Sequence, residues 1–80
     1  MSFSLFDCVT LIQDIPDDGL CAGMVGAIVD VYINPTLAYE VEFSDAYGRT
    51  IAQLALLPEQ IRPYADGDAV PRHPELPFNE

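Results

Sequence analysis

The sequence predicts an all-β fold, a small five-stranded SH3-like barrel, and three observations support this prediction. Residues 39–43 alternate strictly between apolar and acidic side chains, which is the pattern of a half-buried strand. Other short runs of β-branched residues lie between turn-forming glycine, proline and aspartate. A short turn that begins with proline precedes the last run, and closing such a sheet into a barrel protects its edges.

The first strand is expected over residues 6–11, with an extension toward Ile15 before Pro16 halts regular pairing. Residues 16–19 read Pro-Asp-Asp-Gly, which is turn chemistry, because proline presets φ and glycine accepts a left-handed backbone. Together with Asp14 these aspartates lack the spacing of a calcium-binding loop. A solvated turn is therefore expected here.

The second strand and its entry are expected over residues 23–33. Gly23 and Gly26 at the start indicate a close backbone approach or a bulge. The apolar residues of this run mix spacings of two and three, which is typical of a twisted or bulged strand that is partly buried on both faces. A phosphate-binding loop is not expected, because the glycines are followed by neither a lysine nor a helix.

The second half of the barrel is predicted from residue 39 onward. Tyr39, Val41 and Phe43 are expected to point inward, and the two glutamates between them outward. A hairpin loop with a left-handed Gly48 comes next. The remaining elements are the fourth strand, a 3₁₀ turn and a short edge strand, expected over residues 49–56, 57–60 and 61–64.

These elements predict a barrel over residues 1–64 and an acidic, proline-rich, flexible tail over residues 65–80. His73 is the only histidine of the chain, and it lies in this tail. A general base has to be held within hydrogen-bond reach of its proton, and a mobile tail does not hold it there. The sequence therefore predicts no enzyme.

The chain has 13 acidic residues, three arginines and no lysine, for a formal net charge of -10. Nucleic-acid binding draws most of its affinity from cations that neutralise phosphates, and anionic membranes attract the same cations. We therefore expect no nucleic-acid partner and no membrane partner. The charge favours solubility or a basic protein partner attracted by electrostatic steering.

No metal or cofactor is expected. Cys8 and Cys21 have no metal-type spacing and no nearby histidine. No apolar run approaches the roughly 20 residues of a membrane helix. The first residues lack the basic and long apolar segments of a secretion signal. These features favour a cytoplasmic location with two reduced thiols.

A partner surface is expected where acidic side chains lie beside apolar side chains of the first loop. Its candidate residues are Asp17, Asp18, Leu20, Cys21, Met24, Glu40 and Glu42. Two alternatives stay open for other surfaces. The apolar faces of the second and fourth strands would serve a structural module that associates with itself, and the tyrosines would serve a groove for proline-rich peptides.

Several motifs spread over residues 7–64 resemble one family. They are Asp7-x-Val9, Asp14-Ile15-Pro16, Gly19-Leu20, Gly23-x-Val25-Gly26, Val31-Tyr32, Tyr39-Glu40-Val41-Glu42-Phe43, Gly48-x-Thr50 and Gln60-Ile61-Arg62-Pro63. In this order they resemble the uncharacterised bacterial family named domain of unknown function 4926. The glycine-rich entry of the second strand also resembles that of KOW-type barrels. The family resemblance implies a small cytoplasmic barrel without assigned activity, and it supplies no catalytic residues.

The charge and the resemblance together predict a non-catalytic protein-interaction module that engages its partner through an acidic barrel face. An antitoxin-like or immunity-like role is one form of this function that the resemblance implies. The KOW-like strand entry makes a nucleic-acid-binding barrel the rival prediction, and the charge of -10 disfavours it.

Overall fold

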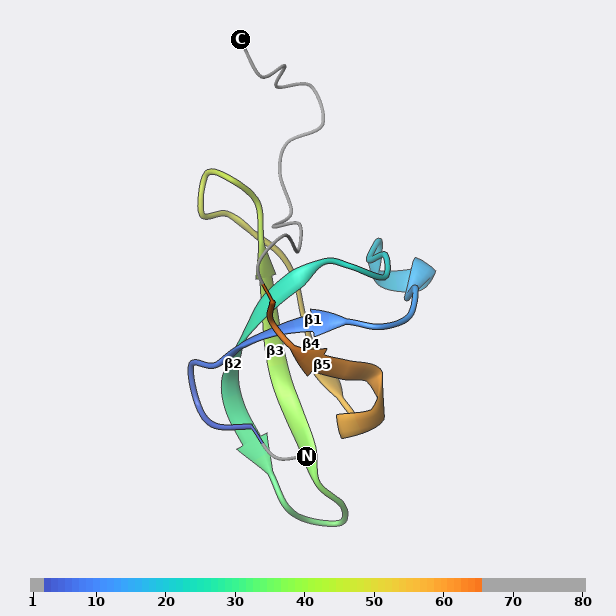
Figure 1. Ribbon diagram of the computed structural model, residues 1–80, viewed down its shortest axis with the longest axis vertical. Helices are drawn as coiled ribbons and strands as arrows, with labels where there is room; N and C mark the ends of the chain where they lie inside the picture. Colours follow the sequence, from blue (N-terminus) through green and yellow to red (C-terminus); the bar gives the residue numbers. More distant parts are fainter. Residues whose placement is uncertain (1–2, 66–80) are drawn as a thin grey trace, which may run out of the picture.

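The computed structural model describes residues 3–65 and shows one antiparallel sheet of five strands in the order β4-β3-β2-β1-β5 (Figure 1). The strands are β1 (Cys8–Leu11), β2 (Val25–Tyr32), β3 (Ala38–Ser44), β4 (Thr50–Leu56) and β5 (Ile61–Pro63). Two 3₁₀ helices, η1 (Pro16–Asp18) and η2 (Pro58–Gln60), lie in the connections. The predicted all-β, SH3-like fold with a 3₁₀ turn before the last strand is confirmed. The expected protection of the edges by closure is wrong for the described residues, because no pairing joins β4 to β5 and the edge of β4 stays free.

The sheet is curved, so that β1 and β5 cross β3 and β4 (Figure 1). The side chains between these two parts form one core: Val9, Leu11, Leu20, Ile28, Tyr39, Val41, Phe43, Leu56 and Ile61. β4 and β5 stand at opposite ends of the strand order, and η2 carries the chain from one to the other. The curvature therefore lets a single sheet enclose its own core.

The alternation predicted for β3 is confirmed. Tyr39, Val41 and Phe43 are buried, whereas Glu40 and Glu42 lie half exposed on the opposite face. Burying a large apolar side chain stabilises the fold by about 1.5–3 kcal/mol, so these three residues are a large part of a small domain's stability. The Tyr39 hydroxyl keeps a polar partner, because it accepts a hydrogen bond from the Phe3 amide at 3.2 Å.

Gly26 shows the close approach that the sequence predicted. A β-carbon at this position would lie 2.6 Å from Cγ1 of Val41 and 2.9 Å from the carbonyl oxygen of Glu42. The backbone of β2 thus passes directly against β3 where the sheet bends, and only a residue without a side chain fits. The bulge that the mixed apolar spacing predicted also exists, although it lies further along the strand, between Ile28 and Asp30.

The bulge changes which face of the sheet each following residue occupies. Ile28 is opposite Val41 and Asp30 is opposite Glu40, so Val29 is an extra residue on β2. Side chains alternate along a strand, and one extra residue reverses the alternation. Ile28 and Val31 both reach the core, whereas Asp30 between them is exposed.

The first strand is shorter than predicted. It begins at Cys8, because Phe6 has a φ of 70° in the turn before it, where its side chain is 77% exposed. It ends at Leu11, and Ile15 instead forms an isolated bridge with Leu20.

The turns and the last two elements agree with the sequence. Gly19 and Gly48 have positive φ values of 72° and 82°. η2 and β5 follow the fourth strand as expected. The barrel therefore ends at Pro63, and the flexible tail predicted over residues 65–80 lies outside the described residues except for Ala65.

We expect Gly26→Ala to lower the free energy of unfolding by about 1–3 kcal/mol, because the new methyl group overlaps Val41 and the rigid backbone of Glu42. Urea unfolding followed by circular dichroism measures this change. Ala55→Ser, which adds one atom at an exposed site on β4, is the control and stays within about 0.5 kcal/mol. Equal stability of Gly26→Ala and the wild type would contradict the close approach.

Candidate interaction surface

The outer face of β2, β3 and β4 gathers three carboxylates with neutral polar side chains. We call this surface the acidic sheet face and define it by Asp30, Tyr32, Glu40, Glu42, Thr50 and Gln53. The strand register places its members together. Asp30 is directly opposite Glu40, and Glu42 is directly opposite Gln53 on β4.

Neutral donors hold the two glutamates in place. Glu40 accepts hydrogen bonds from the Tyr32 hydroxyl at 3.2 Å and from Nε2 of Gln53 at 3.1 Å. Glu42 accepts a hydrogen bond from the Thr50 hydroxyl. The carboxylates are therefore ordered by partners that leave their negative charge uncompensated.

The negative charges of this face contribute to a raised pKa of Tyr32. Its pKa is raised above the ordinary 10.0 by partial desolvation, by the charge of Glu40, by the hydrogen bond to Glu40 and by the charge of Asp30. Asp30 and Glu40 lie directly opposite each other on the neighbouring strands β2 and β3. Two like charges in this position repel each other and destabilise the sheet. A cation from outside the chain would relieve this repulsion.

The arginines of the described chain are engaged elsewhere. Nε of Arg49 lies 2.8 Å from a carboxylate oxygen of Asp45, and the Arg49 guanidinium also stacks on the Tyr47 ring at 5.2 Å. Arg62 lies on β5, where its guanidinium donates to the Pro63 carbonyl. Within residues 3–65 no ion pair reaches the three carboxylates of the acidic sheet face.

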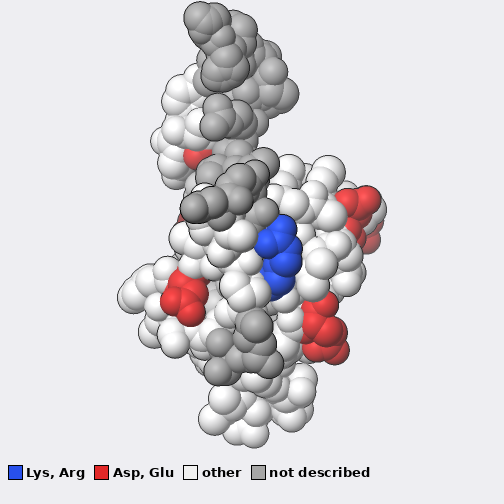
Figure 2. Space-filling view, viewed as in Figure 1, with Lys and Arg blue, Asp and Glu red and all other residues white. Residues whose placement is uncertain are grey.

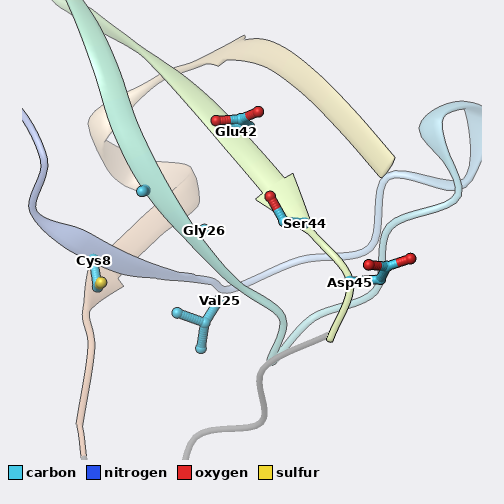
Figure 3. A pocket seen from close by; sticks show the side chains of 7 residues that line it. Cys8, Val25, Gly26, Glu42, Ser44 and Asp45 are labelled. Carbon is cyan, nitrogen blue, oxygen red and sulfur yellow. The ribbon is translucent and has the colours of Figure 1, made fainter. Parts of the chain in front are cut away.

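An open pocket of about 220 Å³ adjoins this face (Figure 3). Its wall is mostly apolar where β1 and β2 meet, and the carboxylates of Glu42 and Asp45 stand at its β3 side. The lining residues are Cys8, Val25, Gly26, Ala27, Glu42, Ser44 and Asp45. The pocket therefore offers an apolar contact next to a negative charge.

Asp45 organises the hairpin loop at the edge of this pocket. Its carboxylate accepts hydrogen bonds from the Tyr47 amide at 2.8 Å, the Arg49 amide at 3.0 Å and Nε of Arg49 at 2.8 Å. Partial desolvation raises the pKa of Asp45, but the two amides and the guanidinium outweigh it and hold the pKa below the ordinary 3.8. The loop is thus fixed by its own side chains.

The residues predicted for a partner surface do not form one acidic face. Glu40 and Glu42 belong to the acidic sheet face, whereas Asp17 and Asp18 lie on η1, at the tip of a loop that projects away from β3 (Figure 1). In the view of Figure 2 the carboxylates likewise occur in separate groups, with uncharged and positively charged surface between them. The expected grouping is corrected to two surfaces.

The apolar part of the predicted surface also needs correction. Leu20 is only 1% exposed and belongs to the core, because its bridge with Ile15 turns the loop back onto the barrel. Met24 is half buried against the core, and its sulfur accepts a contact from the Cys21 amide at 3.5 Å. Cys21 is exposed.

Asp30 is the residue of the acidic sheet face that the sequence reasoning missed. It has the same parity as Ile28, so a regular strand would turn it toward the core. The bulge at Val29 reverses this orientation. An aspartate at an inward position of an apolar strand is itself a signal for such a bulge.

The tyrosines do not form one aromatic groove. Tyr39 is a core residue with 1% exposure, whereas Tyr32, Tyr47 and Tyr64 are exposed on β2, the β3–β4 loop and the chain after β5. Both cysteines are free. Within residues 3–65 no group of three or more metal-ligating side chains is close enough to hold an ion. The same residues contain no helix of the length and hydropathy needed to span a bilayer.

The fold and this surface define a class: a small curved antiparallel sheet with an acidic outer face. Residues 5–63 match the family described as domain of unknown function (DUF4926), which is most of the chain. The chain belongs to this family, and the predicted resemblance is confirmed. No curated protein and no solved structure matches the chain.

We expect Glu40→Gln to lower the pKa of Tyr32 toward 10.0, because the substitution removes the nearest negative charge. A pH titration of the tyrosine ring carbons by NMR measures the change for each tyrosine separately. Glu59→Gln removes a charge on η2 and serves as the control, with Tyr32 unchanged. An identical pKa of Tyr32 in the wild type and in Glu40→Gln would show that the Glu40 carboxylate does not raise the pKa of Tyr32.

Asp45→Asn is expected to destabilise the chain at pH 7 more than at pH 3. The pKa of Asp45 is lower in the folded chain than in the unfolded chain, so its stabilisation is present above the ordinary 3.8 and is lost as the pH falls through the folded value. Urea unfolding at the two pH values measures the difference. Asp17→Asn is the matched control, and a pH-independent effect of Asp45→Asn would refute the assignment.

Proposed function

We propose that this chain is a non-catalytic protein-interaction module whose acidic sheet face binds a basic region of a protein partner. The observation that supports the proposal is the set of three carboxylates on one face, of which the two glutamates are held by neutral donors and none has an ion pair among the described residues. A partner's Lys or Arg would supply the missing positive charge.

The overall charge supports the same kind of partner. A chain with a formal charge of -10 attracts a basic protein over distances of about a Debye length, which is roughly 10 Å at 0.1 M salt. Phosphates carry the same sign as this chain, so a nucleic acid would be repelled. The neighbouring pocket provides apolar contact for the stem or side chain of a bound residue.

An antitoxin-like or immunity-like role in the cytoplasm is the biological form we propose for this module. Such a role requires a chain that binds a partner without performing chemistry. A rigid sheet face suits this task, because carboxylates that are already ordered lose little side-chain entropy on binding. The hydrogen bonds to Glu40 and Glu42 provide that order.

The test is capture of partners from native lysate on the immobilised full chain at about 0.05 M and about 0.5 M salt. We expect a stoichiometric partner at low salt. Glu40→Gln/Glu42→Gln is expected to lose about tenfold in affinity, since two exposed ion pairs contribute roughly 0.7 kcal/mol each. Asp17→Asn/Asp18→Asn removes the same charge from η1 and retains the partner.

Recovery of no stoichiometric partner would contradict the proposal. A partner lost on Asp17→Asn/Asp18→Asn but retained on Glu40→Gln/Glu42→Gln would move the interaction to η1 and overturn the assignment to the acidic sheet face.

A further inference from the structure

We propose that the free edge of β4 accepts an extended segment of the partner as an additional strand, with cationic side chains on the outer face and apolar side chains on the inner face, where Ala52 and Leu54 of β4 pack against the core. This inference rests on the proposed function, because it specifies how the basic partner meets the acidic sheet face. Addition of a strand to a sheet edge is a common mode of peptide recognition.

β4 presents an edge of unusual character. It stands at the end of the strand order, and within residues 3–65 it pairs with β3 alone. A register shift lies at its start, where Ile51 is 48% exposed, and residues 52–56 are in regular register. The strand reads TIAQLAL, without a charge or a proline. Edge strands usually carry charged residues or prolines, because these prevent pairing with other chains.

The carboxylates of β3 lean toward this edge. Glu42 bonds to Thr50 and Glu40 bonds to Gln53, so both carboxylate groups contact side chains of β4. An added strand would lie about 4.8 Å beyond β4. A Lys or Arg side chain on its outer face is long enough to cross that spacing and meet the carboxylates. The charge of the acidic sheet face thus selects a basic segment at this edge.

Two other occupants fit the edge less well. A second copy would offer its own β4, which has no cation to meet Glu40 and Glu42, and each copy has a formal charge of -10. Residues 66–80 of this chain include prolines at 71, 74 and 77, and each proline lacks the N–H that a strand ladder needs. A basic partner segment without proline satisfies both requirements.

The test uses two synthetic peptides and the full chain. The first peptide alternates Lys and Val, Lys-Val-Lys-Val-Lys-Val-Lys, and the second replaces each Val by Pro at the same charge. Amide hydrogen exchange is followed by NMR for residues 50–56. At peptide concentrations ten times Kd, the edge-facing amides of β4 are expected to exchange about tenfold more slowly with the Val peptide and unchanged with the Pro peptide.

Variants link the strand to the acidic sheet face. Glu40→Gln/Glu42→Gln is expected to weaken the Val peptide about tenfold, since two ion pairs of roughly 0.7 kcal/mol are lost. Asp17→Asn/Asp18→Asn serves as the matched control and leaves the affinity unchanged. Such a result supports strand addition guided by the two glutamates.

The other outcomes separate this inference from the proposed function. Equal binding of both peptides without protection of β4 overturns strand addition, while the acidic sheet face remains a docking surface. Binding of neither peptide also overturns strand addition. The proposed function is then tested by the capture experiment, whose result does not depend on strand addition. Protection of β4 that grows with protein concentration, without peptide, identifies a second copy as the occupant and overturns the basic segment.

Discussion

The pairing of β2 with β3 is the constraint on which both the core and the acidic sheet face depend. β2 lies between β1 and β3, so it has to serve both parts of the curved sheet. Gly26 permits the close contact with β3, and the bulge at Val29 then reverses the alternation of side chains. One strand thereby buries Ile28 and Val31 while it exposes Asp30 beside Glu40.

This arrangement costs stability at the surface. Like charges directly opposite on neighbouring strands repel each other, and the neutral donors around Glu40 and Glu42 order the carboxylates without compensating their charge. A surface selected for stability alone would place a Lys or Arg opposite such residues. The cost is therefore an argument that the face has a use outside the folding of the chain.

The sequence was sufficient for most of the fold because its signals were local. The alternation of residues 39–43, the left-handed Gly19 and Gly48, and the proline at the start of η2 each have a short-range physical cause, and each is found as predicted. The site was harder to predict, because it depends on strand register. Leu20 was misplaced because a loop bridge turns its side chain into the core, and Asp30 was missed because a bulge decides where its side chain points.

The same distinction supports our proposal that the partner binds the sheet face and not the loop of η1. That loop is tied to the barrel by Leu20 in the core and by the Asp14 carboxylate, which accepts a hydrogen bond from the Ala22 amide at 2.8 Å. The apolar side chain of Leu20 is buried in the core and is not available to a partner. Asp17 and Asp18 are then left as solvated charges. The sheet face instead combines ordered carboxylates, an apolar pocket and an uncharged strand edge. Recognition requires several such features within reach of one partner, and only the β2–β3–β4 side of the described chain brings them together.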